Sequence, residues 1–149
     1  MAGLGVCLAL AAAVTGGSVD PAPGPVVFVP TTHFTLAWTH SIEKVRWEED
    51  YAVAPGQRPG EAPVLQALTA RVRGSAAGME PPEDAVLRKG WYEYTPRMWS
   101  PHGLRLTRSA YTADYEWCVS GHCEPLGRWL PSDGGITLLT ACEQSATRD

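Results

Sequence analysis

The sequence of 149 residues carries little charge, and its basic residues form no cluster. Lysine and arginine total 12 against 16 aspartates and glutamates, so the net charge is −4, and charged residues make up 19% of the chain. Phosphate contacts need clustered lysine and arginine, so we do not expect a nucleic-acid-binding protein. Hydrophobic residues at 44% also exclude a disordered chain.

A long apolar stretch is missing as well. The run Leu4–Val14 is apolar throughout, but as a helix it would span only about 17 Å, against about 30 Å for the hydrocarbon core of a bilayer. That length is typical of the apolar region of a signal peptide. We therefore predict a signal peptide over residues 1–17 and a periplasmic or other extracytoplasmic location. The chain would have no stable membrane span after cleavage and would stay tethered if uncleaved.

Long helices are not expected, because 15 glycines and 13 prolines interrupt the chain. Residues 18–25 form a proline-rich linker that cannot be helical. Short runs with alternating apolar residues follow, and turn residues bound each of them, as is typical of strands. These runs are residues 26–29, 34–40, 46–53, 64–73, 91–95, 104–108, 114–119 and 136–141.

This pattern predicts an all-β fold. We expect one domain over residues 26–142, built as an antiparallel sandwich or small open barrel of about eight short strands with at most one short helix. Residues 143–149 are expected to be a disordered tail.

The densest polar cluster spans residues 39–50. Its carboxylates and imidazole could bind a cation or transfer protons. Alternatively, residues 46–53 and 64–73 form a hairpin with Val53 opposite Val64, which brings Glu48 near Thr69 and Arg71. The acids would then be ordinary cross-strand partners of Arg71 and Arg73. Both interpretations stay open.

Glu49 differs from its neighbours, because strand alternation puts it on one face with Trp47, Tyr51 and Val53. If this carboxylate is buried, it is a better functional candidate than the other acids. We expect the polar cluster to lie near the small-residue loop at residues 74–79, whose backbone amides could hold an anion or simply form a tight turn. The candidate ligand-binding or partner-binding residues are His40, Ser41, Glu43, Glu48, Glu49, Ser75 and Gly78.

No catalytic residue, cofactor or metal site is predicted, and the chain is not expected to be an enzyme. Ser41 and His40 are adjacent, so on a strand they would point to opposite faces and could not act as a pair. A hydrolase that uses His40 with Glu48 or Glu49 is the enzymatic alternative.

The cysteines support a local prediction. The segment Cys118–Cys123 fits a two-residue hairpin turn at Ser120 and Gly121, which makes the two cysteines an opposed pair with Cα atoms about 4.5 Å apart. That distance suits a disulfide. The competing interpretation is a zinc site that also uses His122 and Cys142. With the disulfide formed, Cys142 would be a buried free thiol.

Several motifs together resemble a known family. The stretch from Phe34 to Lys44, the residues Trp47–Glu49, the loop Gly74–Met79 and the pair Gly90–Trp91 are similar to the domain-of-unknown-function family numbered 1850. The resemblance covers roughly residues 34–126. It implies a small exported bacterial protein encoded beside TRAP transporters of the TAXI type, with no activity established for the family.

The resemblance therefore implies an extracytoplasmic accessory or interaction protein of such a transporter. Its possible partners are the transporter permease and the TAXI-type substrate-binding protein. The alternative is a stand-alone β module that binds a small ligand or a cation. A deep pocket that holds His40 and Glu49 together would favour ligand binding or catalysis, and a shallow, partly apolar patch would favour the accessory function.

Overall fold

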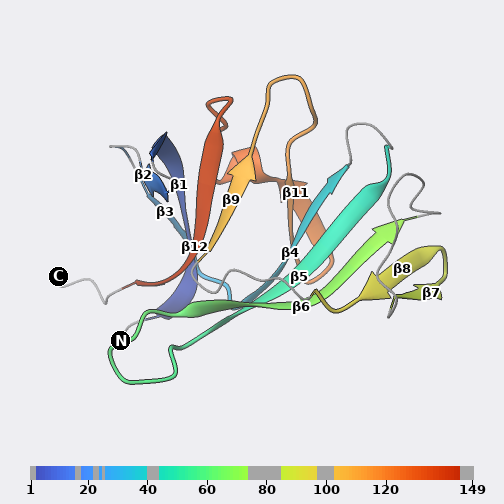
Figure 1. Ribbon diagram of the computed structural model, residues 1–149, viewed down its shortest axis with the longest axis horizontal. Helices are drawn as coiled ribbons and strands as arrows, with labels where there is room; N and C mark the ends of the chain where they lie inside the picture. The colour runs from blue at the N-terminus through green and yellow to red at the C-terminus, as the bar shows by residue number, and fades with distance from the viewer. Residues whose placement is uncertain are drawn as a thin grey trace.

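Two antiparallel sheets account for most of the residues that the computed structural model describes (Figure 1). The only helix in these residues is the short 3-10 helix η1 (Leu126–Arg128). The all-β prediction is confirmed as a sandwich, since neither sheet closes into a barrel among the described residues. The structure describes residues 3–15, 18–21, 24, 26–39, 44–73, 85–96 and 103–144.

The larger sheet has seven strands in the order β11-β10-β4-β5-β6-β8-β7. Its three longest strands, β4, β5 and β6, are neighbours connected in sequence as antiparallel pairs. In Figure 1 this sheet extends past the smaller sheet toward β8 and β7. The strands are β4 (His33–Thr39), β5 (Arg46–Ala54), β6 (Val64–Arg73), β7 (Val86–Arg88), β8 (Trp91–Tyr94), β10 (Glu116–Val119) and β11 (His122–Pro125).

The smaller sheet has five strands in the order β2-β1-β12-β9, with β3 also paired to β1. Its centre is the antiparallel pair of β1 and β12, which joins the first and the last described strands along eight residue pairs. The strands are β1 (Gly3–Thr15), β2 (Ser18–Pro21), β3 (Val27–Val29), β9 (Gly103–Thr107) and β12 (Ile136–Gln144).

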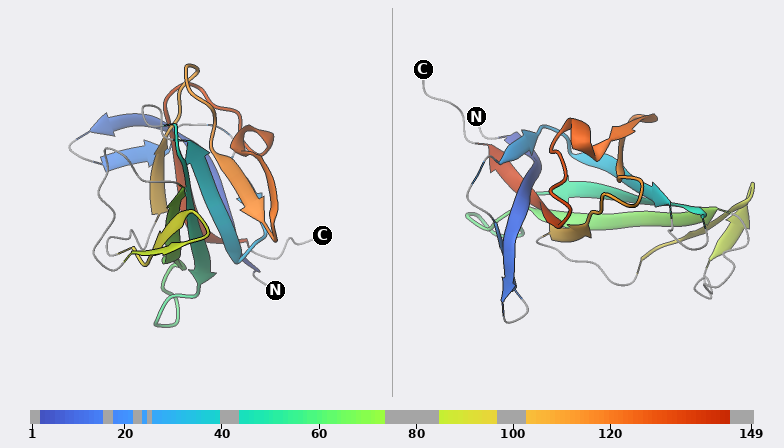
Figure 2. Two further views of the ribbon diagram at one scale, coloured as in Figure 1. Left: turned by 90° about the vertical axis from the view of Figure 1, so that its right-hand side faces the viewer. Right: turned by 90° about the horizontal axis from the view of Figure 1, so that it is seen from above.

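The hydrophobic core takes its side chains from both sheets, and Figure 2 shows how the two sheets are arranged. Alternation along each strand sends one set of apolar side chains inward, where burying each large aliphatic residue contributes about 1.5–3 kcal/mol. We call the core-facing side of the seven-stranded sheet its inner face and the other side its outer face. The core residues are Val6, Leu8, Val29, Phe34, Leu36, Tyr51, Val53, Leu65, Leu106, Trp117, Leu126, Leu130, Leu139 and Ala141.

Strand β1 lies outside the domain boundaries expected from the sequence, which began at residue 26. The apolar run assigned to a signal peptide lies inside the sheet, with Val6 and Leu8 fully buried and Cys7 bonded to Cys142. An uninterrupted apolar run has no period of two, so the sequence pattern does not separate a leader from a buried strand. Residues 18–21 of the expected linker likewise form β2. Cleavage after residue 17 stays a prediction, tested below.

The β5–β6 hairpin forms as predicted but with a different register. Val64 lies opposite Ala54 rather than Val53, and a β-bulge between Asp50 and Tyr51 shifts the pairing again. An extra residue in a strand turns its side chain out of the alternation. Leu68 falls at this bulge, between the paired residues Ala67 and Thr69, and is 40% exposed.

Candidate functional site

The sequence-predicted site residues do not form one described cluster. His40, Ser41, Glu43, Ser75 and Gly78 all lie outside the described residues, as does the rest of the loop at 74–79. Glu48 and Glu49 are described, and they point to opposite faces of β5. Glu48 hydrogen-bonds arginines on the outer face, whereas Glu49 hydrogen-bonds Tyr51 on the inner face. The two carboxylates therefore cannot act together on one substrate.

Glu48 belongs to an ion-pair ladder that crosses the outer face from β10 to β6. Arg46 pairs with Glu116 and, through Nε, with Glu48 at 2.7 Å. The second oxygen of Glu48 accepts from Arg71 Nε at 2.7 Å, and Arg71 also pairs with Asp50 at 2.8 Å. This confirms the structural interpretation of Glu48, because its charge is met by the cross-strand partner Arg71.

Asp50 lies at the end of this ladder. Thr35 Oγ1 donates a hydrogen bond of 2.6 Å to Asp50, and Arg71 donates two more. Burial alone would raise the pKa of Asp50, but the hydrogen bonds from Arg71 and Thr35 outweigh burial and hold that pKa below its ordinary value. Asp50 is therefore an ionised structural residue.

Among the described residues, Arg73 forms no ion pair with Glu48 or Asp50, which pair with Arg71 instead, so the predicted pairing of these two acids with Arg73 is wrong. Its guanidinium carbon lies 5.1 Å from the centroid of the Trp91 ring on β8. Arg73 and Trp91 are directly opposite each other in the sheet register, so the contact is a cross-strand cation–π interaction. The ladder described above thus ends with the pair of Arg71 and Asp50.

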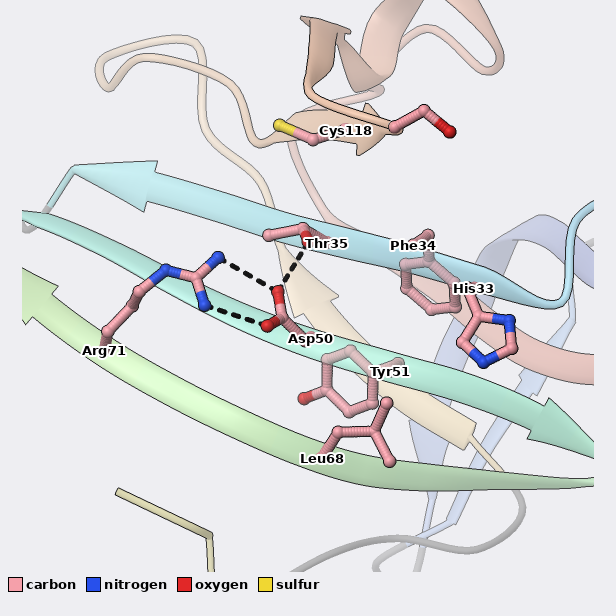
Figure 3. A pocket seen from close by; sticks show the side chains of 9 residues that line it. His33, Phe34, Thr35, Asp50, Tyr51, Leu68, Arg71 and Cys118 are labelled. Carbon is pink, nitrogen blue, oxygen red and sulfur yellow. Dashed lines mark hydrogen bonds and ion pairs between the residues drawn. The ribbon is translucent and has the colours of Figure 1, made fainter. Parts of the chain in front are cut away.

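A shallow hollow of about 360 Å³ lies over the bulge on the outer face, where Arg71, Asp50 and Thr35 meet (Figure 3). Thr35, Asp50 and Arg71 satisfy one another there, as the dashed lines in Figure 3 show. The exposed Leu68 adds an apolar element to its border. We call this feature the outer hollow; its lining residues are His33, Phe34, Thr35, Asp50, Tyr51, Leu68, Arg71, Cys118 and Ser120.

The hairpin disulfide is confirmed. Cys118 and Cys123 are directly opposed in the β10–β11 pair with Cα atoms 4.0 Å apart, and they are bonded. Ser120 and Gly121 both have positive φ, at 52° and 81°, which is the signature of a two-residue type I′ turn. The sequence signal was sufficient here because the turn is local.

The assignment of Cys142 as a free thiol is wrong, because Cys142 is bonded to Cys7 with Cα atoms 5.9 Å apart. A zinc site from Cys118, His122, Cys123 and Cys142 is excluded by the same bonds. All three of its cysteines are oxidised in disulfides, and only a thiolate binds zinc. The described residues contain no group of three or more metal-binding side chains.

Glu49 is half-buried on the inner face, at the margin of the core. Its Oε1 accepts a hydrogen bond of 3.0 Å from the hydroxyl of Tyr51. Among the described residues, no lysine, arginine or histidine forms an ion pair with it. Burial raises the pKa of Glu49, and the hydrogen bond from Tyr51 opposes that shift only in part.

Aromatic side chains surround this carboxylate. Trp38 and Trp47 face each other across β4 and β5 with ring centroids 6.1 Å apart and nearly parallel planes. Tyr115 packs against Trp38 at 5.8 Å. In the other direction Glu49 lies opposite Ala70, which in turn lies opposite Tyr94 on β8. We call Trp38, Trp47, Tyr51, Tyr94 and Tyr115 the aromatic group.

The charge of Glu49 acts on three of these residues. Burial is the main reason why the pKa values of Tyr51, Tyr94 and Tyr115 are raised, and the negative charge of Glu49 raises all three further. Sequence reasoning identified Trp47 and Tyr51 as neighbours of Glu49 but missed Tyr94 and Tyr115, because their strand partners depend on the order of strands in the sheet.

A second polar cluster was missed entirely. Arg108 is only 3% exposed, and its guanidinium forms two hydrogen bonds to Asp114, at 3.0 and 2.8 Å. It also donates to the Leu130 carbonyl and the Thr137 hydroxyl. Asp114 in turn accepts from the backbone N–H of Gly127. Because its guanidinium is engaged by Asp114, Leu130 and Thr137, Arg108 has a structural role and is not a candidate ligand-binding residue.

Comparison with known proteins gives one match. The sequence model of the family described as "Domain of unknown function (DUF1850)" matches residues 34–126. No curated protein and no solved structure matches the chain. The described residues include no helix of the length and apolarity needed to span a membrane.

Proposed function

The chain belongs to the DUF1850 family, and from that starting point we propose that it is an extracytoplasmic accessory protein of a TAXI-type TRAP solute transporter. The protein binds the permease or the substrate-binding protein of the transporter, and the outer hollow is the contact surface. Its function is recognition and not catalysis.

One observation carries this proposal: the charged groups of the outer hollow, Asp50 and Arg71, already satisfy each other. Asp50 is held by Arg71 and Thr35 through three hydrogen bonds. A catalytic acid or base needs a proton-transfer position open to substrate. A surface of fixed charges with an apolar element beside it, here Leu68, instead matches the features of a transient protein interface.

The two disulfides support the proposed compartment. Cys7–Cys142 and Cys118–Cys123 use every cysteine of the chain. Disulfides persist in the periplasm and outside the cell and are rare in the cytosol. An extracytoplasmic protein is also placed where a transporter's substrate-binding subunit operates.

The test is co-purification from the native envelope after crosslinking, with mass spectrometry for the permease and the TAXI-type substrate-binding protein. We expect the wild-type chain to retain at least one of them. Leu68→Arg puts a charge into the outer hollow and is expected to abolish retention. Leu87→Arg is the matched control, because Leu87 is an exposed leucine on β7 that does not line the hollow.

Two outcomes would contradict the proposal. In the first, neither transporter protein is retained by the wild-type chain. In the second, Leu68→Arg retains the partner as well as Leu87→Arg does, which would place the contact elsewhere.

A second function, binding of a small ligand by the domain itself, is favoured by a separate observation. Glu49 is a half-buried carboxylate for which the described residues supply a hydroxyl donor and no cation. It lies on the face opposite the outer hollow, so both functions can coexist on one domain.

A further inference from the structure

We propose that Glu49 and the aromatic group form a binding site for a small organic ammonium ion. This inference rests on the second function above, ligand binding by the domain itself, and is independent of any transporter partner. It assigns the site a ligand class and a position on the inner face of the seven-stranded sheet.

The first argument is charge. A carboxylate withdrawn from water is unfavourable unless a cation or several hydrogen bonds compensate it. Glu49 receives one hydrogen bond, from the neutral hydroxyl of Tyr51. The nearest arginines along the sheet, Arg46 and Arg71, are engaged on the outer face by Glu48 and its neighbours. Within the described residues, no positive charge compensates Glu49, so an ammonium group bound there would supply one.

The second argument is the kind of cation. Metal ions such as Ca²⁺ need six to eight oxygen ligands and Mg²⁺ needs near-ideal octahedral geometry, whereas this site offers one carboxylate among indole and phenol rings. Aromatic faces attract organic cations, which are weakly hydrated and have apolar groups that can pack against the rings. An ammonium group beside Glu49 would gain both the ion pair and the cation–π contacts.

The third argument is placement. Two-residue alternation sets Trp47, Glu49 and Tyr51 in a row along β5, and Trp38 stands beside Trp47 on β4. Tyr94 approaches from β8 across Ala70, whose small side chain leaves the carboxylate and the phenol without a bulky residue between them. The aromatic rings therefore flank Glu49 along the strand on both sides and across the sheet.

The fourth argument is access. Glu49, Trp38, Trp47, Tyr94 and Tyr115 are all partly exposed, unlike the core residues Leu36 and Phe34 on the same face. This portion of the sheet lies toward the end of β4, where the two sheets diverge in Figure 1. Apart from Tyr51, which is a core residue, the aromatic group thus borders the core and does not fill it.

The experiment titrates the purified full chain with n-butylammonium and tetramethylammonium chlorides and follows tryptophan fluorescence and the indole N–H signals in NMR. Sodium chloride at equal ionic strength and the neutral analogue 1-butanol are the controls. We expect saturable shifts with the two ammonium ions and none with sodium or 1-butanol. Since charge-assisted contacts are about twice as strong as neutral ones, Glu49→Gln should weaken ammonium binding by about tenfold or more.

Two further variants make the result specific. Glu48→Gln removes a charge one residue away on the opposite face, and it should bind ammonium within about twofold of wild type because solvent and distance screen its charge. Trp38→Leu keeps the carboxylate and removes an aromatic face, and it should weaken binding by several-fold.

Three results would overturn the inference: no saturable shift with either ammonium ion, equal binding of 1-butanol, or unchanged affinity in Glu49→Gln. Because no transporter protein is present in the titration, none of these results bears on the accessory function. Loss of transporter capture in the crosslinking experiment would likewise leave the ammonium site intact.

Discussion

Glu48 and Glu49 are neighbours in the chain, yet their carboxylates have opposite electrostatic surroundings. Glu48 accepts from two guanidinium groups, those of Arg46 and Arg71, each at 2.7 Å. Glu49 accepts from the uncharged hydroxyl of Tyr51. Because successive side chains of β5 point to opposite faces, Glu48 forms ion pairs that stabilise the sheet, whereas no cation among the described residues compensates Glu49.

This contrast predicts opposite effects of the same substitution. Glu48→Gln leaves Arg46 and Arg71 with less compensation and should lower the free energy of unfolding by about 1–3 kcal/mol. Glu49→Gln retains an oxygen that can accept from Tyr51 and removes a poorly solvated charge, so it should leave stability unchanged or raise it at neutral pH. Urea unfolding of both variants measures the difference, and a large loss in Glu49→Gln would contradict it.

The pH dependence of stability should distinguish Glu49 from Asp50. The folded pKa of Glu49 is raised, so its contribution is fully present below the ordinary glutamate pKa of about 4.3 and is lost as pH rises through the folded value. The folded pKa of Asp50 is lowered, so its contribution is present above the ordinary aspartate pKa and is lost as pH falls.

The measurement is the free energy of unfolding from pH 3 to pH 8 for wild type, Glu49→Gln and Asp50→Asn. Relative to wild type, Glu49→Gln should gain stability as pH rises above about 4.3. Asp50→Asn should show its full loss of stability above about 3.9, and the loss should become smaller as pH falls below that value. Parallel curves for the two variants would show that their surroundings are alike, contrary to the structure.

The thiol content reports on β1. With both disulfides formed, the purified chain should contain no thiol that reacts under denaturing, non-reducing conditions. Removal of residues 1–17 would delete Cys7 and leave Cys142 as a single reactive thiol. Thiol labelling combined with the intact mass therefore decides between a retained strand β1 and a cleaved signal peptide. The predicted cleavage would give the single thiol and the smaller mass, whereas retention of β1, in which Val6 and Leu8 are fully buried, would give no thiol and the full mass.

The two disulfides should contribute unequally to stability. Cys7 and Cys142 are 135 residues apart, and Cys118 and Cys123 only 5. The chain-entropy relation then gives about 5 kcal/mol for the long loop and about 2 kcal/mol for the hairpin. Paired Cys→Ser variants should show a larger fall in melting temperature for the Cys7–Cys142 pair, and the reverse order would mean that β1 is not anchored to β12.

Arg108 should be essential for stability. Arg108→Met leaves Asp114 without its bidentate partner and removes the bonds to Leu130 and Thr137, so the expected loss is about 3–5 kcal/mol. Arg105→Met on the same strand is the matched control, because Arg105 is exposed and should cost less than about 0.5 kcal/mol. Thermal unfolding of the two variants makes the comparison, and similar losses would contradict the structural role.

The sequence predicts those features of this fold that depend on near neighbours. The turn at Ser120 and Gly121 and the bridge across it follow from six residues and are confirmed. The pairing of Glu48 with Arg71 follows from a hairpin with a short loop and is also confirmed. The register itself differs from the prediction, because Val64 lies opposite Ala54 and a bulge beside Asp50 shifts the pairing again.

Features that depend on distant segments were not predictable in this way. Cys7 and Cys142 meet only because β1 and β12 pair at the centre of a sheet. From the sequence, Arg108 looks like an exposed charge at the end of a strand. In the structure, Asp114 and Leu130, which lie on other segments, accept its hydrogen bonds. Only part of the environment of Glu49 could be predicted. Strand alternation predicts that Trp47 and Tyr51 lie on the same face, but the position of Tyr94 depends on the order of strands in the sheet.

The pairing of β1 with β12 also sets the order in which the molecule can be made. The hairpins of β4, β5 and β6 contain their own partners and can form while the chain is still emerging. The smaller sheet cannot form so early, because β1 is synthesised first and its partner β12 is synthesised last. Until then Cys7 has no correct partner, and the thiols of Cys118 and Cys123 emerge before that of Cys142. When the short Cys118–Cys123 disulfide closes rapidly, these two thiols can no longer form a wrong bond with Cys7. The local disulfide therefore favours the correct Cys7–Cys142 pairing.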